Sequence, residues 1–164
     1  MAELTNLEEK LAEVTGLAMA AQAAGGKITK LTVQADGDLA AMLEKMATEA
    51  AETEERCTKL AATFEGKKTA ILDEARQVKK KASKMMDTYL EPDADALDGF
   101  EFLTMAEAAE VGHWSVLKTL NEHARHAELD GLIEWALPIQ ERHFQTVLAG
   151  SQKLAAEEDP NETA

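Results

Sequence analysis

The chain has one cysteine, only three prolines and few basic residues, and these scarcities exclude several classes of protein. A single cysteine, Cys57, excludes a disulfide framework and any cysteine-rich zinc or iron–sulfur site. Seventeen basic against 31 acidic residues give a formal charge of -14, which argues against nucleic-acid or anionic-membrane binding by the bulk surface. No stretch approaches the roughly 18 apolar residues of a membrane helix, and the first residues lack the apolar region of a signal peptide. We therefore expect a cytoplasmic protein that binds neither nucleic acid nor membrane.

The residues that are abundant favour helices. The 164 residues are 45% hydrophobic, which is enough for one domain with a buried core. Ala, Leu, Glu, Lys and Met dominate whereas Val and Ile are sparse, a composition typical of helices rather than sheets. We expect a single all-α domain over residues 1–156, followed by an acidic, disordered tail over residues 157–164.

Apolar spacings of three and four residues predict four long helices and one shorter helix. The expected helices cover about residues 5–33, 39–64, 67–90, 99–125 and 128–156. The first helix is expected to begin with a capping box between Thr5 and Glu8 and to continue through Gly25. Short connections predict an up-and-down four-helix bundle in which the shorter third helix joins the second and third bundle helices.

The apolar stripe predicted for residues 99–125 is interrupted by an acid and an imidazole. At about 100° per residue, Leu103 and Leu117 fall within about 40° of Glu110, and His113 lies about 60° to one side. Glu110 therefore points into the core. Because an isolated ionised side chain is costly to bury, Glu110 and His113 need a partner, a proton or a metal.

The last helix has a matching interruption, because Gln140 lies at the centre of its apolar stripe and His143 follows one turn later. A turn between His126 and Ala127 makes the last two helices antiparallel neighbours. Glu110 is then expected to face His143, and His113 to face Gln140. If the turn were displaced by two residues, the residues of one helix would shift by about 3 to 6 Å along the other helix.

Two interpretations of these four residues are left open. The first is a metal site, because Glu-x-x-His directs a carboxylate and an imidazole at one cation in carboxylate-bridged helical bundles. The second is a buried cluster of hydrogen bonds and ion pairs that fixes helix register without a ligand. Glu107 and Glu141 border the stripes, and we rank them below Glu110, as outer ligands or as exposed acids.

Several short segments in the second half of the chain support a family resemblance. They are Glu110-Val111-Gly112-His113-Trp114-Ser115-Val116, Thr119-Leu120, Leu137 and Lys153-Leu154-Ala155. With them, residues 107–155 resemble the second helical pair of the bacterial ferritin-like stress proteins of the YciE/YciF type and, more distantly, rubrerythrins. The resemblance implies a ferritin-like bundle with a two-metal centre.

The chain also departs from the wider ferritin-like pattern. No acid occupies the core stripe of the first helix, and Glu49 is the one candidate ligand of the second. In the last helix, Gln140 replaces a carboxylate with an amide. We therefore expect a ferritin-like metal-binding protein whose site is too poor in acids for a two-metal oxidase. The expected ligands are Glu110, His113 and His143, supported by Glu49 and Gln140.

The oxygen and imidazole donors favour iron or manganese and are compatible with zinc. Neither haem nor a nucleotide is expected, since the alanine-rich core leaves little room for a macrocycle. The function expected from this site is peroxide- or oxygen-related stress defence, with enzymatic activity left open. The alternative is a metal-free structural or stress-response bundle that has lost the ancestral site, and a homodimer is left open in both cases.

Overall fold

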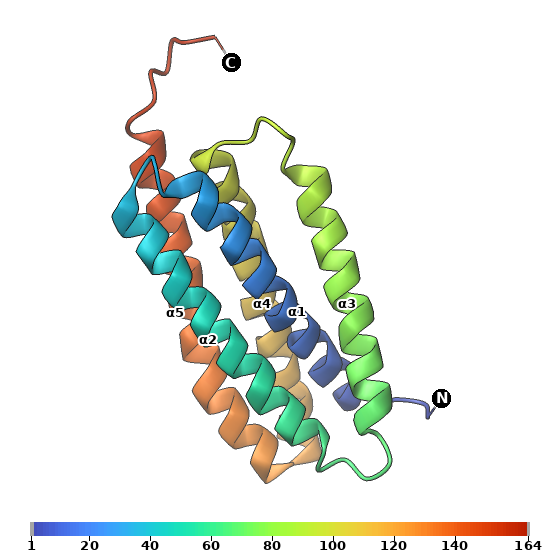
Figure 1. The fold of residues 1–164 in the computed structure, drawn as a ribbon. Coiled ribbons are helices and arrows are strands. Elements are labelled where there is room, and N and C mark those ends of the chain that lie inside the picture. Colours follow the sequence, from blue (N-terminus) through green and yellow to red (C-terminus); the bar gives the residue numbers. More distant parts are fainter. Residues whose placement is uncertain (1, 164) are drawn as a thin grey trace.

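The computed structural model describes residues 2–163, and these residues form helices and connections without any strand (Figure 1). The five helices are α1 (Asn6–Thr32), α2 (Gly37–Ala61), α3 (Lys68–Tyr89), α4 (Ala96–Ala124) and α5 (Ala127–Ala155). The prediction of an all-α chain is therefore confirmed, and the helix ends differ from those expected by three residues or fewer. Met1, at the start of the expected domain, and Ala164, at the end of the expected tail, lie outside the described residues.

The helix ends follow local capping chemistry. Glu8 N donates to Thr5 Oγ1 at 3.3 Å and Thr5 N donates to Glu8 Oε2 at 2.7 Å, so the predicted capping box is confirmed. A second capping box, between Asp95 and Asp98, starts α4 three residues earlier than expected. As predicted, α1 continues through Gly25, which lies against α2.

Four helices form a four-helix-bundle-like core, and the fifth lies outside it. α1 packs against α2 and α4, α5 packs against α4 and α2, and α3 packs mainly along α1. Consecutive helices run in opposite directions (Figure 1). With 22 residues, or about 33 Å, α3 carries the chain back along the bundle, so α2 and α4 run in the same direction. The up-and-down order thus describes the five consecutive helices, whereas the four bundle helices form two parallel pairs, α1 with α5 and α2 with α4.

Met42 of α2 points away from the core. A spacing of three residues from Leu39 would also suit an inward Met42, yet its side chain is 47% exposed and Leu43 is buried instead. Positions 39, 43, 46, 50, 53, 57 and 60 alternate spacings of four and three residues, which keeps one continuous face toward the neighbouring helices. Adjacent helix residues differ by about 100°, so a series that includes Met42 leaves that face.

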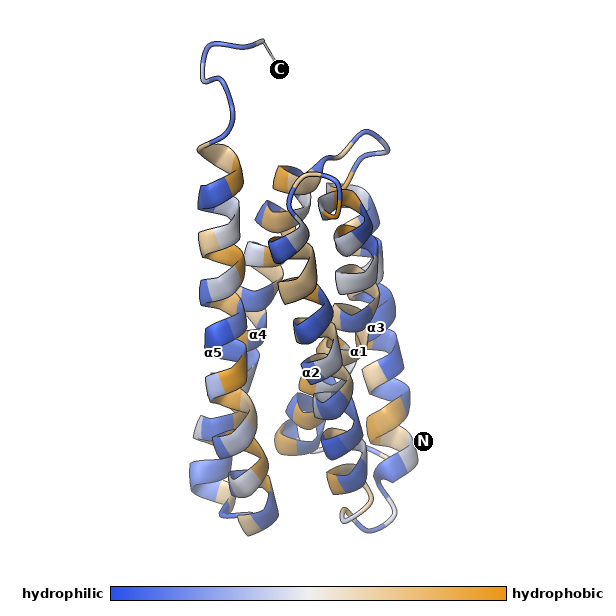
Figure 2. Cartoon of the chain, turned by 60° about the vertical axis from the view of Figure 1, so that its left-hand side comes forward, coloured by the Kyte–Doolittle hydropathy of each residue, from blue (hydrophilic) through white to orange (hydrophobic). Residues whose placement is uncertain are grey.

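Apolar and polar residues alternate around the helices of the bundle (Figure 2). The buried apolar residues of the described chain form two clusters rather than one. The Trp114 cluster, at the end of the bundle that contains the α4–α5 turn, includes Leu11, Val14, Cys57, Ile71, Trp114, Leu117, Leu129 and Ile133. The Phe100 cluster, at the opposite end, includes Ile28, Leu43, Met46, Met86, Phe100, Leu103, Val147 and Leu154. The buried polar residues at the level between them are Thr53 of α2, Glu107 and Glu110 of α4, and Gln140 and His143 of α5. These five residues, with the half-buried Glu49 of α2, form a polar layer across the middle of the bundle.

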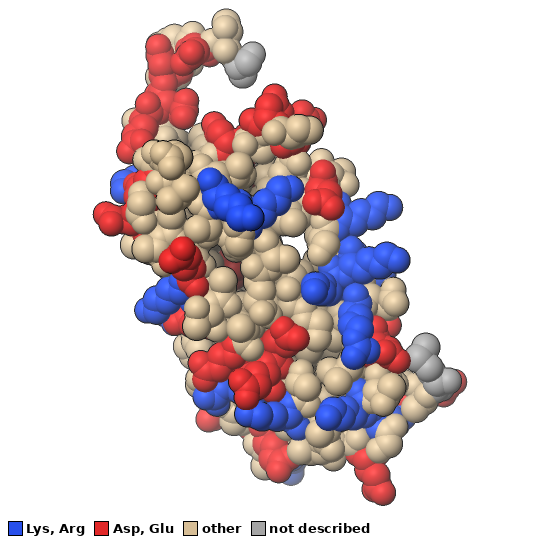
Figure 3. All heavy atoms as spheres, viewed as in Figure 1, with Lys and Arg blue, Asp and Glu red and all other residues tan. Residues whose placement is uncertain are grey.

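No helix within residues 2–163 combines the length and the apolar character needed to cross a membrane. The chain after α5, residues 156–163, contains no helix and extends away from the bundle (Figure 1). The charge on the surface is unevenly distributed, because Lys and Arg gather along α3 (Figure 3).

Candidate functional site

The register between α4 and α5 is set by the turn that joins them. Arg125 ends α4 in the left-handed conformation, with φ of 56°. The buried Asn121 then holds the turn: its Nδ2 donates to His126 O at 3.0 Å and to Asp130 Oδ1 at 2.6 Å, and His126 N donates to Asn121 Oδ1 at 3.1 Å. Three hydrogen bonds from one buried side chain fix which residues of the two helices face each other.

The pairs that face each other are Glu107 with His143 and Glu110 with Gln140. The expected pairing of Glu110 with His143 and of His113 with Gln140 is therefore wrong. On antiparallel neighbouring helices, residues that face each other are equally far along the chain from the centre of the turn. Both observed pairs therefore place that centre at Arg125, about one and a half residues before the expected position. That displacement moves the contacts of α4 by nearly one helical turn relative to α5.

Gln140 links the two carboxyl groups of α4. With its amide nitrogen toward α4, Gln140 donates to Glu110 Oε2 at 3.2 Å and to Glu107 Oε2 at 3.1 Å. A rotation of the amide by 180° replaces the nitrogen with the oxygen, and three oxygens then face one another at these distances. Only protons or a cation between the oxygens would stabilise that second orientation. Gln140 therefore has one orientation that closes the layer with hydrogen bonds and one that offers a third oxygen ligand.

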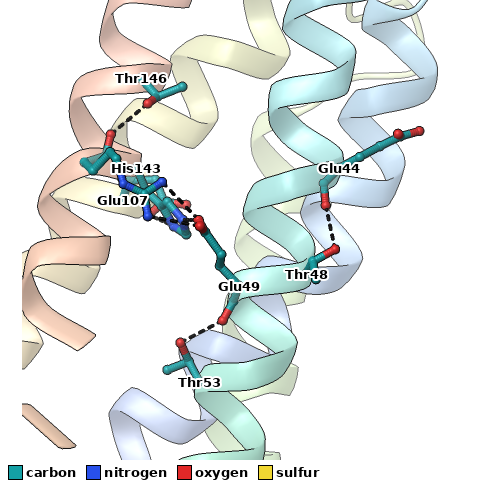
Figure 4. A network of polar contacts seen from close by, with 8 residues as sticks. Glu44, Thr48, Glu49, Thr53, Glu107, His143 and Thr146 are labelled. Atoms are coloured by element: carbon teal, nitrogen blue, oxygen red, sulfur yellow. Dashed lines mark hydrogen bonds and ion pairs between the residues drawn. The ribbon is translucent and has the colours of Figure 1, made fainter. Parts of the chain in front are cut away.

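His143 lies between carboxylates from two other helices (Figure 4). Its Nε2 is 2.5 Å from Glu49 Oε2 on α2, and its Nδ1 is 3.7 Å from Glu107 Oε2 on α4. Arg142 makes a bidentate contact with Glu49, with distances of 3.0 Å and 3.2 Å from its guanidinium nitrogens to the two carboxylate oxygens. Glu49, the expected α2 residue, is thus joined to the polar layer through His143.

The charges of the layer determine where its protons reside. Burial, followed by the nearby charge of Glu107, raises the pKa of Glu110 well above its ordinary value. Burial lowers the pKa of His143, but its contacts with Glu107 and then Glu49 outweigh burial and raise that pKa. Burial opposes the charge on Glu49, yet hydrogen bonds from Arg142 and then His143 lower the pKa of Glu49. The layer therefore favours a proton on Glu110 and a proton on His143.

His113 does not join the layer. Its side chain is 37% exposed, and its Nδ1 lies 2.8 Å from Glu13 Oε2 and 3.4 Å from Lys10 Nζ, both on α1. The expectation that His113 would face Gln140 is wrong because His113 occupies the flank of α4 that faces α1. Helical periodicity does not predict Glu13 as its partner, because Glu13 lies outside the apolar stripe of α1.

Glu107 is the residue whose importance the sequence interpretation underestimates. Helical spacing puts it at the border of the α4 stripe, yet only 3% of its surface is exposed and it contacts both Gln140 and His143. Glu107-x-x-Glu110 and Gln140-x-x-His143 have the same spacing, so on antiparallel helices both pairs can meet at once. Glu110-x-x-His113 has that spacing too, so the spacing alone does not select Glu107.

The donor set suits a metal chemically, although Gln140 closes it with hydrogen bonds when its amide nitrogen faces α4. Within residues 2–163, no three His, Cys, Asp or Glu side chains are arranged to hold a metal ion by themselves. Carboxylate, amide and imidazole donors nevertheless converge from α4 and α5, and these are ligand types of iron and manganese. A cation here would need Gln140 as a further ligand. Cys57 is unsuited as a ligand, since burial raises the pKa of its thiol to about 12.

No protein-family model matches this chain, and neither a curated protein nor a solved structure does so.

Proposed function

We propose that this chain is a ferritin-like metal-binding protein whose polar layer binds one divalent cation. The proposed ligands are Glu107, Glu110, Gln140 and His143. The observation that carries the proposal is the approach of Gln140 to two buried carboxyl groups at 3.1 and 3.2 Å, at the level between the two apolar clusters. Oxygen donors outnumber nitrogen donors, so iron or manganese is favoured over zinc.

The course of the chain supports the ferritin-like part of the proposal. Ferritin-like bundles have one long crossover connection and carry their ligands on facing helices. In this chain α3 is the crossover, and the proposed ligands lie on α4 and α5. α1 contributes no acid to the layer; its buried Thr15 donates to Leu11 O of its own helix. A set with two carboxyl groups suits one cation rather than two.

Glu49 and Arg142 act from outside the proposed ligand set. Glu49 contacts the His143 nitrogen that faces away from Glu107, and such a contact orients an imidazole and increases its basicity. Arg142 compensates the charge of Glu49 at the surface of the bundle. A bound iron or manganese ion would supply Lewis-acid and redox chemistry, and we assign the protein to peroxide- or oxygen-related defence in the cytoplasm.

Metal binding is tested by titrating chelator-treated protein with Mn²⁺, Zn²⁺ and, without oxygen, Fe²⁺. Trp114 lies one turn from Glu110, so a Trp135→Phe background leaves one tryptophan that reports on the layer. We expect about one equivalent of metal and the release of about two protons, because a divalent cation replaces the protons on Glu110 and His143.

Three variants make the test specific. Glu110→Gln should abolish binding, and Gln140→Glu should strengthen it by restoring a carboxylate. His113→Ala is the matched control and should bind as the parent does, because His113 contacts α1 instead of the layer. Binding of less than about a tenth of an equivalent by the parent, or loss of binding in His113→Ala alone, would refute the proposal.

The metal-free bundle is the second candidate. It is favoured by the hydrogen bonds that Gln140 makes to both carboxyl groups, because these satisfy the layer without a ligand. In that case the layer fixes the register of α4 and α5, and the protein acts through its surface. The same titration distinguishes the two candidates, since a metal-free bundle shows neither bound metal nor proton release.

A further inference from the structure

A groove lies between α3 and α4 on the side of the bundle away from α2 and α5. Both helices pack against α1, but α3 is not packed along α4. Gly16 brings the first half of α3 close to α1, since a Cβ at this position would lie 2.4 Å from Ala75 O. Beyond this contact the helices leave a groove of about 310 Å³, and Figure 3 shows the hollow between α1 and α3.

The walls of the groove are almost entirely apolar. α1 contributes small side chains, among them Ala20, Ala21 and Ala24, which leave the space open. Met85 of α3 and Met105 of α4 line it from both sides and are exposed. Methionine side chains are flexible and adapt to ligands of different shape. Along α4 the lining runs from residue 102 to residue 113, about 16 Å, which is a length suited to one alkyl chain.

Acidic residues line the inner part of the groove. Glu107 and Glu110 both contribute to its wall, although each is only 3% exposed, and His113 lines its end. The cationic partners of the polar layer, Arg142 and His143, belong to α5 and do not line the groove. The groove therefore combines an apolar channel with the protonated carboxyl group of Glu110 and the charge of Glu107, whose positive neighbours are on the opposite side.

We propose that this groove binds a primary alkylammonium ion, with the alkyl chain along the alanines of α1 and the ammonium group toward Glu107 and Glu110. The apolar wall excludes a small hydrophilic cation, and the carboxyl groups disfavour an anionic head group. The lysines of α3 do not alter this preference, because those at residues 79–81 and 84 are exposed and none lines the groove. This binding approaches Glu110 from the side opposite α5 and does not depend on a bound metal.

The test is calorimetric titration of the full chain, in the presence of a chelator, with hexylamine, octylamine and decylamine. Affinity should rise about three- to fourfold per added methylene until the groove is filled. Octanol and octanoate have similar chains and different head groups, and each should bind about tenfold or more weakly than octylamine. Equal binding of octanoate and octylamine, or an affinity independent of chain length, would overturn the proposal.

Two variants locate the site. Ala82→Phe fills the groove from α3 and should reduce octylamine affinity at least about tenfold, whereas Ala108→Phe, on the exposed side of α4 outside the lining, should not. Glu107→Gln keeps the shape of the groove and removes the charge, so it should weaken octylamine while leaving octanol unchanged. If octylamine binds a chain that binds no metal, this proposal stands and the metal proposal fails; if metal binds and octylamine does not, the reverse holds.

Discussion

His143 and His113 should contribute differently to stability, because His143 is buried and His113 is partly exposed. Replacing the buried His143 with alanine leaves Glu49 and Glu107 without their shared imidazole, and we expect a loss of roughly 3 kcal/mol in the free energy of unfolding. His113 pairs with Glu13 at a partly exposed site, so His113→Ala should cost less than about 1 kcal/mol. Urea unfolding of both variants measures the difference, and equal losses would contradict the arrangement described for the layer.

Glu110 is expected to destabilise the fold at neutral pH. Its pKa is raised in the folded state, so folding requires uptake of a proton once the pH exceeds the ordinary pKa of glutamate. The contribution of Glu110 to the free energy of unfolding is fully present below the ordinary pKa of glutamate and is lost as pH rises through the folded-state pKa. The loss is about 1.4 kcal/mol for each pH unit between the unfolded-state and folded-state pKa values. Glutamine cannot ionise, so Glu110→Gln should be more stable than the parent.

The gain in stability expected for Glu110→Gln should increase with pH. Urea unfolding at about pH 5 and about pH 8 should show a larger advantage of Glu110→Gln at the higher pH. An advantage that shrinks as pH rises would show that Glu110 is ionised in the folded protein. The same substitution removes a proposed ligand, so the more stable variant should be the one without metal binding.

Helical periodicity predicts some of these residues and not others. Glu110 and Gln140 lie at the centres of their apolar stripes, so their inward direction follows from 100° per residue. Glu107 and His113 lie about 60° to either side of Glu110, and periodicity treats the two flanks alike. Only the positions of the neighbouring helices bury Glu107 against α5 and direct His113 toward α1.

Close helix packing gives the clearest test among the helices. A Cβ at Gly150 of α5 would lie 2.3 Å from Cε1 of the fully buried Phe100, so Gly150→Ala should cost about 1–3 kcal/mol. Gly112 of α4 has no atom within 4 Å of its Cβ position, and Gly112→Ala should stabilise by about 0.5–1 kcal/mol. Thermal unfolding measures both, and a tolerated Gly150→Ala would mean that α4 and α5 are less tightly packed at this level.

Helices were easier to predict than the connections between them. Their existence follows from apolar spacing, and the start of α1 follows from the Thr5–Glu8 capping box. The α4–α5 turn depends on Arg125 in a left-handed conformation, for which the usual sequence signal is glycine or asparagine. Because that signal is absent, the register of α4 and α5, and with it the pairing in the polar layer, could not be derived from the sequence.

For the molecule as a whole, stability should be greatest in mildly acidic solution, near about pH 5. Glu110 and His143 have raised pKa values, so their contributions to stability are lost as pH rises through the folded-state values. Glu49 has a lowered pKa, so its contribution is lost only in stronger acid. The formal charge of -14 adds repulsion at neutral pH.

The urea midpoint measured against pH tests this profile. Added salt should reduce the part of the slope due to surface repulsion and leave the part due to the buried layer. The slope above pH 6 should be smaller in Glu110→Gln. A midpoint that increases between about pH 6 and pH 8 would contradict the assignment of protons to Glu110 and His143.

The order of the helices was predictable because the connections are short, and the parallel course of α2 and α4 follows from the length of the third helix. The space between α3 and α4 was not predictable. It depends on the close contact of α1 and α3 at Gly16 and on the small side chains of α1 beside the second half of α3. Both are relations between two helices, which the pattern of one helix does not predict.

The division of the core by the polar layer has a consequence for cooperativity. All four long helices pass through both apolar clusters, so no domain boundary separates them, yet the polar layer with its titrating groups lies between the clusters. At a pH at which Glu110 and His143 lose their protons, local unfolding of one end of the bundle should no longer require unfolding of the other end. Amide hydrogen exchange in alkaline solution should then give different opening free energies at the two ends of α4, and equal values near pH 5.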